Sequence, residues 1–516
     1  MEDTTSEPLE TTPLLGDSAP LRESPSPRQT RPKPNPWHTI LSAAGVLMIL
    51  NVGSYVSLAA STAILQDIVC DKYWDHVHPV PTIIPFEDRC KIEPVQSEVA
   101  YINGWKDVFE VLPAITLAVP YGTLADRIGR KKVLLLAIIG CFMNDVWVRL
   151  VYWLRDTFPV RAVWLGGLWQ LIGAGAATLS SISHVMVADV CPVDQRTTAF
   201  SQIQSAHLLA QFLFVPIGGY LVSINPWIPM VMSSIFMIFG FFGALFLIPE
   251  TLPSITENSP RDNIPHLDQQ NDNAKAGLGL YLHINAQLTT LFRLGRWARK
   301  NVRLILVVLC FFAYQLGHQA EGSLLLQYAS KRTGWSLGKA SYLISLGAGV
   351  NLVVHALLIP GLSSFLLHHL RLHEISKDKL IAQISGAFLA IGSSIIFLAT
   401  SWVGLVAGEC LASLGLAFPV PARSVVTSMV PKDHLAALYT AISVLSYAAM
   451  VAGGPLLASS FHWGMQLGDF WVGMPFLISA VCFIVALLAV SVVSNLARDH
   501  DPTGDMPGEE TDSDES

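Results

Sequence analysis

The chain has 516 residues, of which 52% are hydrophobic and only 14% charged, and its formal net charge is −7. A soluble globular domain carries roughly 25% charged residues, so this composition excludes an ordinary soluble domain. The apolar residues fall into runs of about twenty, the length that a helix needs to cross a bilayer. Most of the acidic excess lies in the final residues. We therefore expect an all-α protein that is embedded in a lipid bilayer. No nucleic acid is expected as a partner.

The first 36 residues form a Pro-rich arm that also contains many Ser and Thr. Such a stretch cannot hold a helix or bury a core, so residues 1–36 are expected to be a disordered cytoplasmic arm. No short apolar stretch with a cleavage site precedes the first span, and no cleaved signal peptide is predicted. Glu10, Leu14 and Leu15 fit an acidic dileucine signal for a sorting adaptor. A vacuolar or endosomal membrane is therefore an alternative to the plasma membrane.

Twelve apolar segments follow, six on each side of a polar connection at 250–301, which ends in a basic amphipathic stretch of the kind that lies along lipid headgroups. The division predicts a six-helix bundle at 37–249, a second at 302–495, and an acidic disordered tail at 496–516. The excess of Lys and Arg in alternate loops places both termini in the cytoplasm. The predicted spans are 38–64, 99–125, 132–152, 162–190, 199–221, 226–248, 302–328, 339–362, 380–400, 402–428, 436–458 and 471–494.

The two halves also look like repeats of each other. A shift of 239 residues carries Pro192 onto Pro431, Gly122 onto Gly361 and His184 onto Arg423. One register held across several helices indicates two parallel six-helix repeats, an arrangement in which the substrate site lies between the halves near the bilayer midplane.

The loop between the second and third spans carries a motif that consists of Gly122, Asp126, Arg127, Gly129 and Arg130. It resembles the signature of the major facilitator superfamily, and the sequence Pro-Glu-Thr at 249–251 agrees with that resemblance. Glycines permit a tight reversal, while the aspartate and arginine suit charge-assisted bonds to neighbouring helix ends. The resemblance implies a small-molecule transporter that works by alternating access. The simpler alternative is an ordinary basic anchor.

Within that superfamily the chain looks most like the proton-coupled folate transporter group and its fungal relatives. This resemblance rests on Asp189, Arg196, His318 and the span-ten residue Arg423. It implies that Arg423, together with the aspartate and the second arginine of the signature loop, takes part in transport. Span five departs from the group by lacking its carboxylate, and the second signature loop is degenerate. Folate is therefore not implied as the substrate, and proton coupling is an expectation only.

Charged residues inside a membrane are costly and usually face a partner or a water-filled cavity. Asp107 and Glu110 lie three apart on span two, and Asp145 and Arg149 lie at a similar outer depth on span three. In one interpretation these residues form a structural cluster that pairs the two spans, with Arg149 reaching outward. In the other, Asp107 or Glu110 accepts a proton at the outer vestibule. The sequence does not separate the two.

On span seven, Tyr314, His318 and Glu321 follow one helical stripe. A histidine beside a carboxylate can exchange a proton near physiological pH. We predict that Glu321 carries the coupling proton and that His318 modulates it, with a purely structural pair as the alternative. Glu409 and Gln170 are also related by 239 residues, and both are expected to face the same cavity.

Nearer the cytoplasm, Arg423 is expected to bind an anionic solute or to form an inner gate with Asp189, with His184 at the matching position of the first half. On span one, Ser54, Ser57 and Ser61 recur at helical spacing. They either line the cavity or serve helix packing.

Cys70 and Cys90 fall in the long outer loop and are predicted to form a disulfide, with two free thiols as the alternative. The sequence holds no HExxH, GxSxG or P-loop motif, so no enzyme, metal or cofactor is expected, and an ion gradient is the predicted driving force. A non-transporting sensor on a transporter fold is the alternative function. Metabolite efflux and uptake of an organic anion fit equally well.

Overall fold

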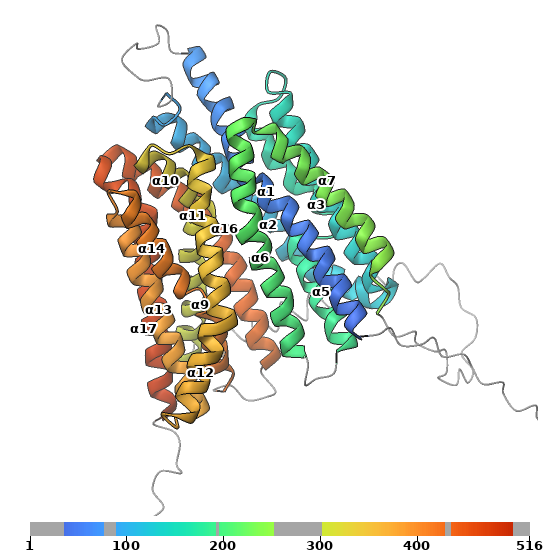
Figure 1. Ribbon diagram of the computed structural model, residues 1–516, viewed down its shortest axis with the longest axis vertical. Helices are drawn as coiled ribbons and strands as arrows, with labels where there is room; N and C mark the ends of the chain where they lie inside the picture. The colour runs from blue at the N-terminus through green and yellow to red at the C-terminus, as the bar shows by residue number, and fades with distance from the viewer. Residues whose placement is uncertain (1–35, 77–88, 192–195, 252–301, 429–434, 499–516) are drawn as a thin grey trace, which may run out of the picture.

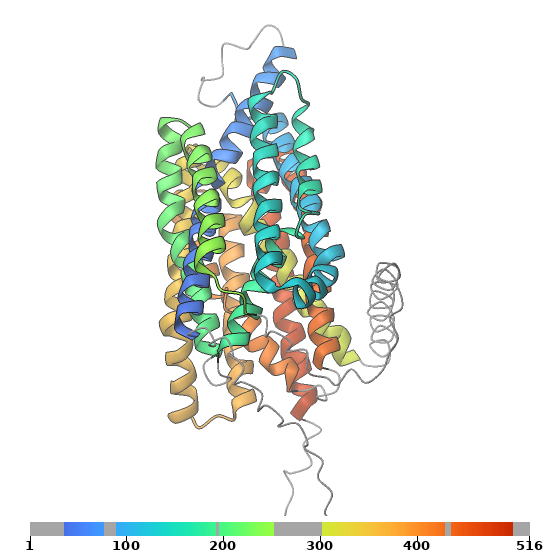
Figure 2. The ribbon, with the colours of Figure 1, turned by 90° about the vertical axis from the view of Figure 1, so that its right-hand side faces the viewer.

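The computed structural model describes residues 36–76, 89–191, 196–251, 302–428 and 435–498, and within these ranges every regular element is a helix. The long helices run side by side, as Figures 1 and 2 show, because each must satisfy its own backbone hydrogen bonds in lipid. The predicted amino-terminal arm with Glu10, Leu14 and Leu15, the amphipathic stretch of the connection and nearly all of the acidic tail lie outside the described residues.

Each of the twelve predicted segments overlaps one helix or a consecutive set of helices. Nine helices in the described ranges are long and apolar enough to cross a bilayer, and a tenth is added if the two parts of the bent helix α2 form one span. The elements of the first half are α1 Pro36–His76, α2 Glu93–Ile128, α3 Arg130–Trp153, η2 Val160–Leu165, α4 Gly166–Trp169, α5 Gly175–Val190, α6 Arg196–Ile224 and α7 Trp227–Leu247.

The second half begins after the connection and shows the same pattern of long and interrupted helices. Its elements are α9 Val302–Ser323, α10 Leu325–Thr333, α11 Leu337–Val353, the π-helical turn η4 Val354–Leu358, α12 Ile359–His368, α13 Glu374–Leu398, α14 Trp402–Leu414, α15 Pro419–Thr427, α16 Leu435–Leu467, η6 Asp469–Gly473 and α17 Met474–Arg498.

Segments four and ten are interrupted near the same point of each half. In segment four, Gly173, Ala174 and Gly175 all have positive φ angles (84°, 57° and 70°), which ends one helix before α5 begins. In segment ten the helix stops at Leu414, and α15 starts afresh at Pro419. Glycine tolerates the left-handed backbone, and proline starts a helix without losing a hydrogen bond.

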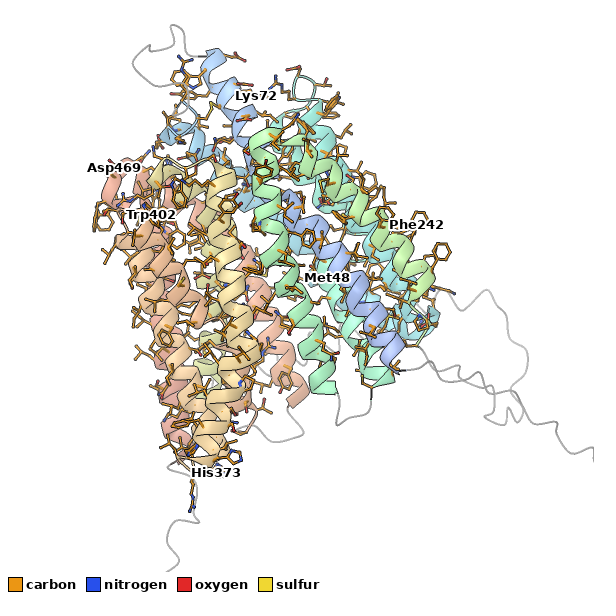
Figure 3. The ribbon with its side chains drawn as sticks, in the orientation of Figure 1. Met48, Lys72, Phe242, His373, Trp402 and Asp469 are labelled. Atoms are coloured by element: carbon orange, nitrogen blue, oxygen red, sulfur yellow. A yellow bond between two sulfur atoms is a disulfide. The ribbon has the colours of Figure 1, made fainter. Side chains whose placement is uncertain are left out.

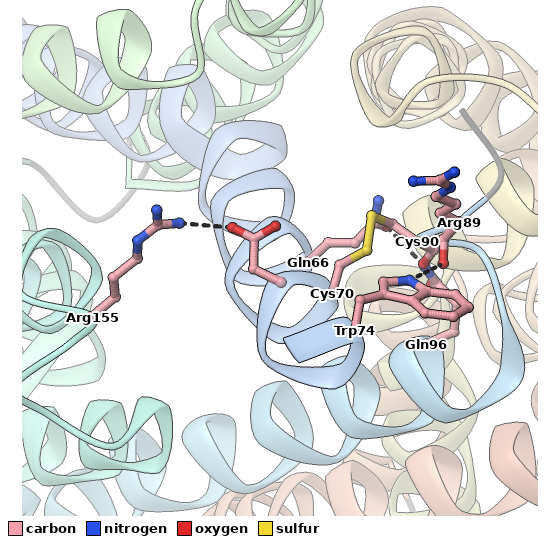
Figure 4. The surroundings of a disulfide bond; sticks show 8 residues. Gln66, Cys70, Trp74, Arg89, Cys90, Gln96 and Arg155 are labelled. Carbon is pink, nitrogen blue, oxygen red and sulfur yellow. Dashed lines mark hydrogen bonds and ion pairs between the residues drawn. A yellow bond between two sulfur atoms is a disulfide. The ribbon is translucent and has the colours of Figure 1, made fainter. Parts of the chain in front are cut away.

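The outer end of the first half is held by a disulfide between Cys70 and Cys90, the pair predicted from the sequence. Their predicted location was wrong for Cys70, which lies in α1 and not in a loop (Figure 4). The apolar run ends near residue 64, but no Gly or Pro follows before residue 77, so the helix continues beyond the hydrocarbon. The indole of Trp74 donates to the carbonyl of Arg89 at 3.2 Å beside this disulfide.

The two halves pack against each other mainly through α2 against α16 and α6 against α11. In Figure 1 the ribbons of the halves approach each other at the top and diverge towards the bottom. The labelled residues of Figure 3 give the orientation, with Lys72, Trp402 and Asp469 towards the upper end and His373 at the lower. The same view shows Phe242 on the outer flank of α7, pointing away from the bundle, as a lipid-facing residue does.

Candidate functional site

A polar cavity of about 230 Å³ lies in the first half, where the second half borders it, towards the outer end of the membrane-spanning region. Helices α1, α2 and α3 form most of its wall, and Met230 of α7 and the end of α9 complete it. Four of its lining residues carry charge, which is unusual inside a membrane and marks a water-filled or solute-binding space. Its lining residues include Ser54, Ser57, Ser61, Thr62, Lys106, Asp107, Asp145, Arg149 and Ser323.

On one side of this cavity, charged side chains connect α2 to α3. Lys106 Nζ lies 3.1 Å from Glu110 Oε1, and the same oxygen accepts a hydrogen bond of 3.0 Å from the Asn144 amide. The predicted cluster between the two spans is therefore present, but its lysine was missed. The signal was in the sequence, because Lys106 and Glu110 have the i, i+4 spacing of a helical ion pair.

The arginine of this cluster does not reach outward. Arg149 Nη2 lies 3.4 Å from Asp145 Oδ2 and donates to Ser233 Oγ of α7 at 2.9 Å. The structural interpretation that had Arg149 extending to the headgroups was therefore wrong in this detail. A carboxylate of its own helix and a hydroxyl on a neighbouring helix hold one end of the guanidinium within the protein, so the side chain need not leave the bundle.

Asp107 faces the other way, towards the second half. Its Oδ2 accepts a hydrogen bond of 3.2 Å from the amide of Gln319 on α9. This contact crosses between the halves at the wall of the cavity. Asp107 and Glu110 thus lie three residues apart on α2, yet Asp107 bonds to Gln319 of α9 and Glu110 bonds to Asn144 of α3.

In the second half, Glu321 and Glu409 are two buried carboxyl groups, exposed by only 8% and 5%. Glu321 Oε2 lies 3.5 Å from His318 Nδ1, and its other oxygen is buried with no hydrogen-bond partner in the described structure. The charge of Glu321 acts electrostatically on the Glu409 carboxyl. The ring of Tyr314 stacks on that of His318, with centroids 5.9 Å apart. Spans seven and ten contact each other where the Tyr314 hydroxyl donates to the carbonyl of Leu416 at 3.5 Å.

The matched pair of Gln170 and Glu409 lies outside the lining of the described cavity. Gln170 is buried at the end of α4, where its side chain packs against Gly175, and Glu409 packs against Gly347 and Ser413. Neither lines the cavity described above. Both segments break just beyond these residues. The expectation that they face one cavity stays a prediction.

The signature loop is organised around Arg130 at the inner end of the first half. Arg130 Nε lies 2.6 Å from Asp189 Oδ2, and its Nη2 lies 3.3 Å from Asp126 Oδ1. Glu250 accepts from the backbone amides of Arg130 and Lys131 at 2.9 and 3.3 Å, so its carboxylate caps the start of α3. Gly129 has a φ of 112° and no room for a Cβ beside that carboxylate.

This network bears on the predicted inner gate. Asp189 is held by Arg130 of its own half, and its expected pairing with Arg423 stays a prediction. Arg423 is exposed and His184 is half-buried, and the His184 ring contacts the carbonyl of Ser180 at 2.7 Å. The half-buried Gly122 and the exposed Arg127 complete the motif. Among the described residues, no group of three or more His, Cys, Asp or Glu side chains is placed to hold a metal.

Comparison with known proteins gives a consistent family. The model of the Major Facilitator Superfamily matches residues 102–373. The efflux pump ustT of Aspergillus flavus is 39% identical over 89% of this chain and 88% of its own length. The MFS efflux pump atnC of Emericella nidulans is 30% identical over 92% and 93%. The crystal structure of the human organic anion transporter MFSD10 shares the fold, with a TM-score of 0.56 at 16% identity, covering 89% of this chain and 100% of that one. The chain therefore belongs to the major facilitator superfamily.

Proposed function

We propose that this chain exports a small polar solute in exchange for protons, by alternating access. Membership of the superfamily makes it a multi-pass membrane transporter and not an enzyme. Efflux is favoured over uptake because two full-length fungal relatives, at 39% and 30% identity, are named efflux pumps. The observation that carries proton coupling is Glu321, a buried carboxyl beside His318 that has one oxygen without a partner.

Contacts between the halves support alternating access, since they gather at the outer end. Lys331 Nζ donates to the carbonyl of Lys91 at 2.6 Å, Lys91 Nζ donates to the carbonyl of Gly334 at 2.7 Å, and His462 Nδ1 lies 2.8 Å from Glu93 Oε1. The ion pairs of the signature loop, by contrast, stay within the first half. Such an arrangement has the outer side of the transporter closed, and a transport cycle must break these outer contacts.

The finer resemblance to the folate transporter group stays a prediction. Neither of the two fungal relatives is named as a folate carrier. In span five, where that group has a carboxylate, this chain has His207, which is bonded to the hydroxyl of Tyr55 at 2.8 Å.

Flux in vesicles tests the proposal. The purified full-length protein is reconstituted, loaded with a mixture of polar fungal metabolites, and each solute is followed by mass spectrometry with and without a pH gradient. We expect at least one solute to move against its concentration only when a proton gradient is imposed. Equilibration that ignores the gradient would contradict proton coupling. The absence of any protein-dependent flux would favour the sensor alternative.

The acidic dileucine motif predicts in which membrane the chain resides. If the adaptor reads the acidic dileucine motif, the double substitution Leu14→Ala and Leu15→Ala should move a fluorescent fusion from the vacuolar or endosomal membrane to the plasma membrane. Ala at Thr11 and Thr12 is the matched control. An unchanged distribution of the dileucine variant would exclude the motif as a sorting signal.

A further inference from the structure

The charges around the polar cavity are paired, with one exception. Lys106 is paired with Glu110, and Arg149 with Asp145, so both cations have a carboxylate of their own. Asp107 also lines the cavity, but its hydrogen bond goes to the neutral amide of Gln319. The cavity wall therefore holds two carboxylates and two cations, but Lys106 pairs with Glu110, which does not line the cavity. Among the described residues, the lining carboxylate outside these ion pairs is Asp107.

The serine hydroxyls of the cavity add a second, independent observation. Ser54 Oγ donates to the carbonyl of Leu50 at 3.3 Å, Ser57 Oγ to that of Gly53 at 3.2 Å, and Ser323 Oγ to that of Gln319 at 2.7 Å. A hydroxyl has one hydrogen and two lone pairs, so a serine that gives its hydrogen to its own helix presents an acceptor. These three serines come from both halves, and they offer the cavity oxygen acceptors and not donors.

A carboxylate outside the described ion pairs and three hydroxyl acceptors fit one kind of chemical group. An ammonium group carries a positive charge and three N–H donors with no acceptor. We propose that the cavity binds a polar solute through an ammonium group at Asp107, with hydroxyl acceptors of α1 and α9 around it. This inference rests on the proposed transport function, since it names the class of solute. A carboxylate or phosphate group would meet the serine acceptors, and the two lining cations, Lys106 and Arg149, already have carboxylate partners.

Binding at Asp107 also has a consequence for the transport cycle. The Asp107 carboxylate is bonded across the interface to Gln319 of the other half. An ammonium group that takes this carboxylate competes with the Gln319 amide, so the bound solute weakens a contact that holds the halves together. Solute recognition and separation of the halves are thereby linked at one residue.

The charge preference of the cavity can be measured without knowing the solute. A cysteine introduced at the cavity wall by Ser61→Cys reacts with methanethiosulfonates, releasing methanesulfinate and forming a mixed disulfide. Two reagents of similar size are compared, one ending in trimethylammonium and one in sulfonate. Each rate at residue 61, resolved by peptide mass spectrometry at low salt, is divided by its rate with free cysteine. We expect the cationic reagent to be favoured on the order of tenfold, as in a cleft that concentrates ions of one sign.

Two further variants make this test decisive. Asp107→Asn keeps the side-chain volume and should bring the ratio of rates close to one. Asp71→Asn removes an exposed carboxylate that pairs with Arg155 at the outer surface, and should leave the ratio unchanged. A ratio at or below one in the parent, or a ratio that Asp107→Asn does not lower, would overturn the proposal. Thr62→Cys repeats the measurement if the first cysteine prevents folding. Labelling needs no transport, so its outcome is separate from that of the flux assay.

Discussion

Glu321→Gln is expected to abolish solute accumulation driven by a pH gradient while sparing solute exchange at equal pH. Glutamine keeps the volume of the buried side chain and mimics a carboxyl group that never releases its proton. With one proton exchanged per solute and no net charge moved, a gradient of one pH unit sustains a solute ratio of about tenfold. That ratio should fall to one in the variant. Counterflow of labelled against unlabelled solute in the same vesicles measures the exchange that should remain.

Glu98→Gln is the matched control, because Glu98 is a partly exposed carboxylate bonded to Arg161 at the outer surface. It should leave accumulation unchanged. Glu409→Gln is the informative partner, since its carboxyl lies within electrostatic reach of Glu321. If Glu321→Gln loses both accumulation and exchange, Glu321 has a structural or binding role. If accumulation survives, the proton site lies elsewhere, with Asp107, Glu110 and Glu409 as the remaining candidates.

The sequence predicts the helices well because the bilayer constrains them strongly. A span needs about twenty apolar residues and leaves few alternatives for the backbone. The interruptions within the helical segments are harder to predict from the sequence. The apolar run at 162–190 reads as one segment, yet three consecutive residues with positive φ divide it, and two of them are glycines that hydropathy does not register. The end of α1 was underestimated for the opposite reason, since a helix can outlast its apolar run.

The site was harder to predict because its contacts join distant residues. Asp107 and Gln319 are 212 positions apart, and only the folded arrangement brings them to the same cavity wall. Lys106 has a local ion pair that helical spacing predicts, so its omission was avoidable. Asp189 illustrates a different limit. Its depth in the membrane does not choose between partners, and only the folded structure shows that its carboxylate bonds to Arg130.

Gly104→Val is expected to open the outer side of the transporter and to reduce transport by at least about tenfold. Gly104 on α2 and Gly454 on α16 let the two halves touch through their backbones, as small residues do at membrane helix interfaces. A Cβ at Gly104 would lie 2.7 Å from the Gly454 carbonyl oxygen, and one at Gly454 would lie 2.4 Å from that of Gly104. Backbone atoms cannot turn aside as a flexible side chain can, so the two helices must separate.

The rate at which a membrane-impermeant maleimide, added from outside, labels a cavity cysteine at residue 61 measures this opening. The rate should rise in Gly104→Val and rise less in Gly104→Ala, because the larger side chain forces a larger separation. Gly45→Val is the control, since Gly45 also lies in a helix but a Cβ there meets nothing within 4 Å. If Gly104→Val and Gly45→Val have equal labelling and equal transport, the backbone contact does not hold the outer side closed. Faster labelling with lost transport would show that closure at this contact is a required step of the cycle.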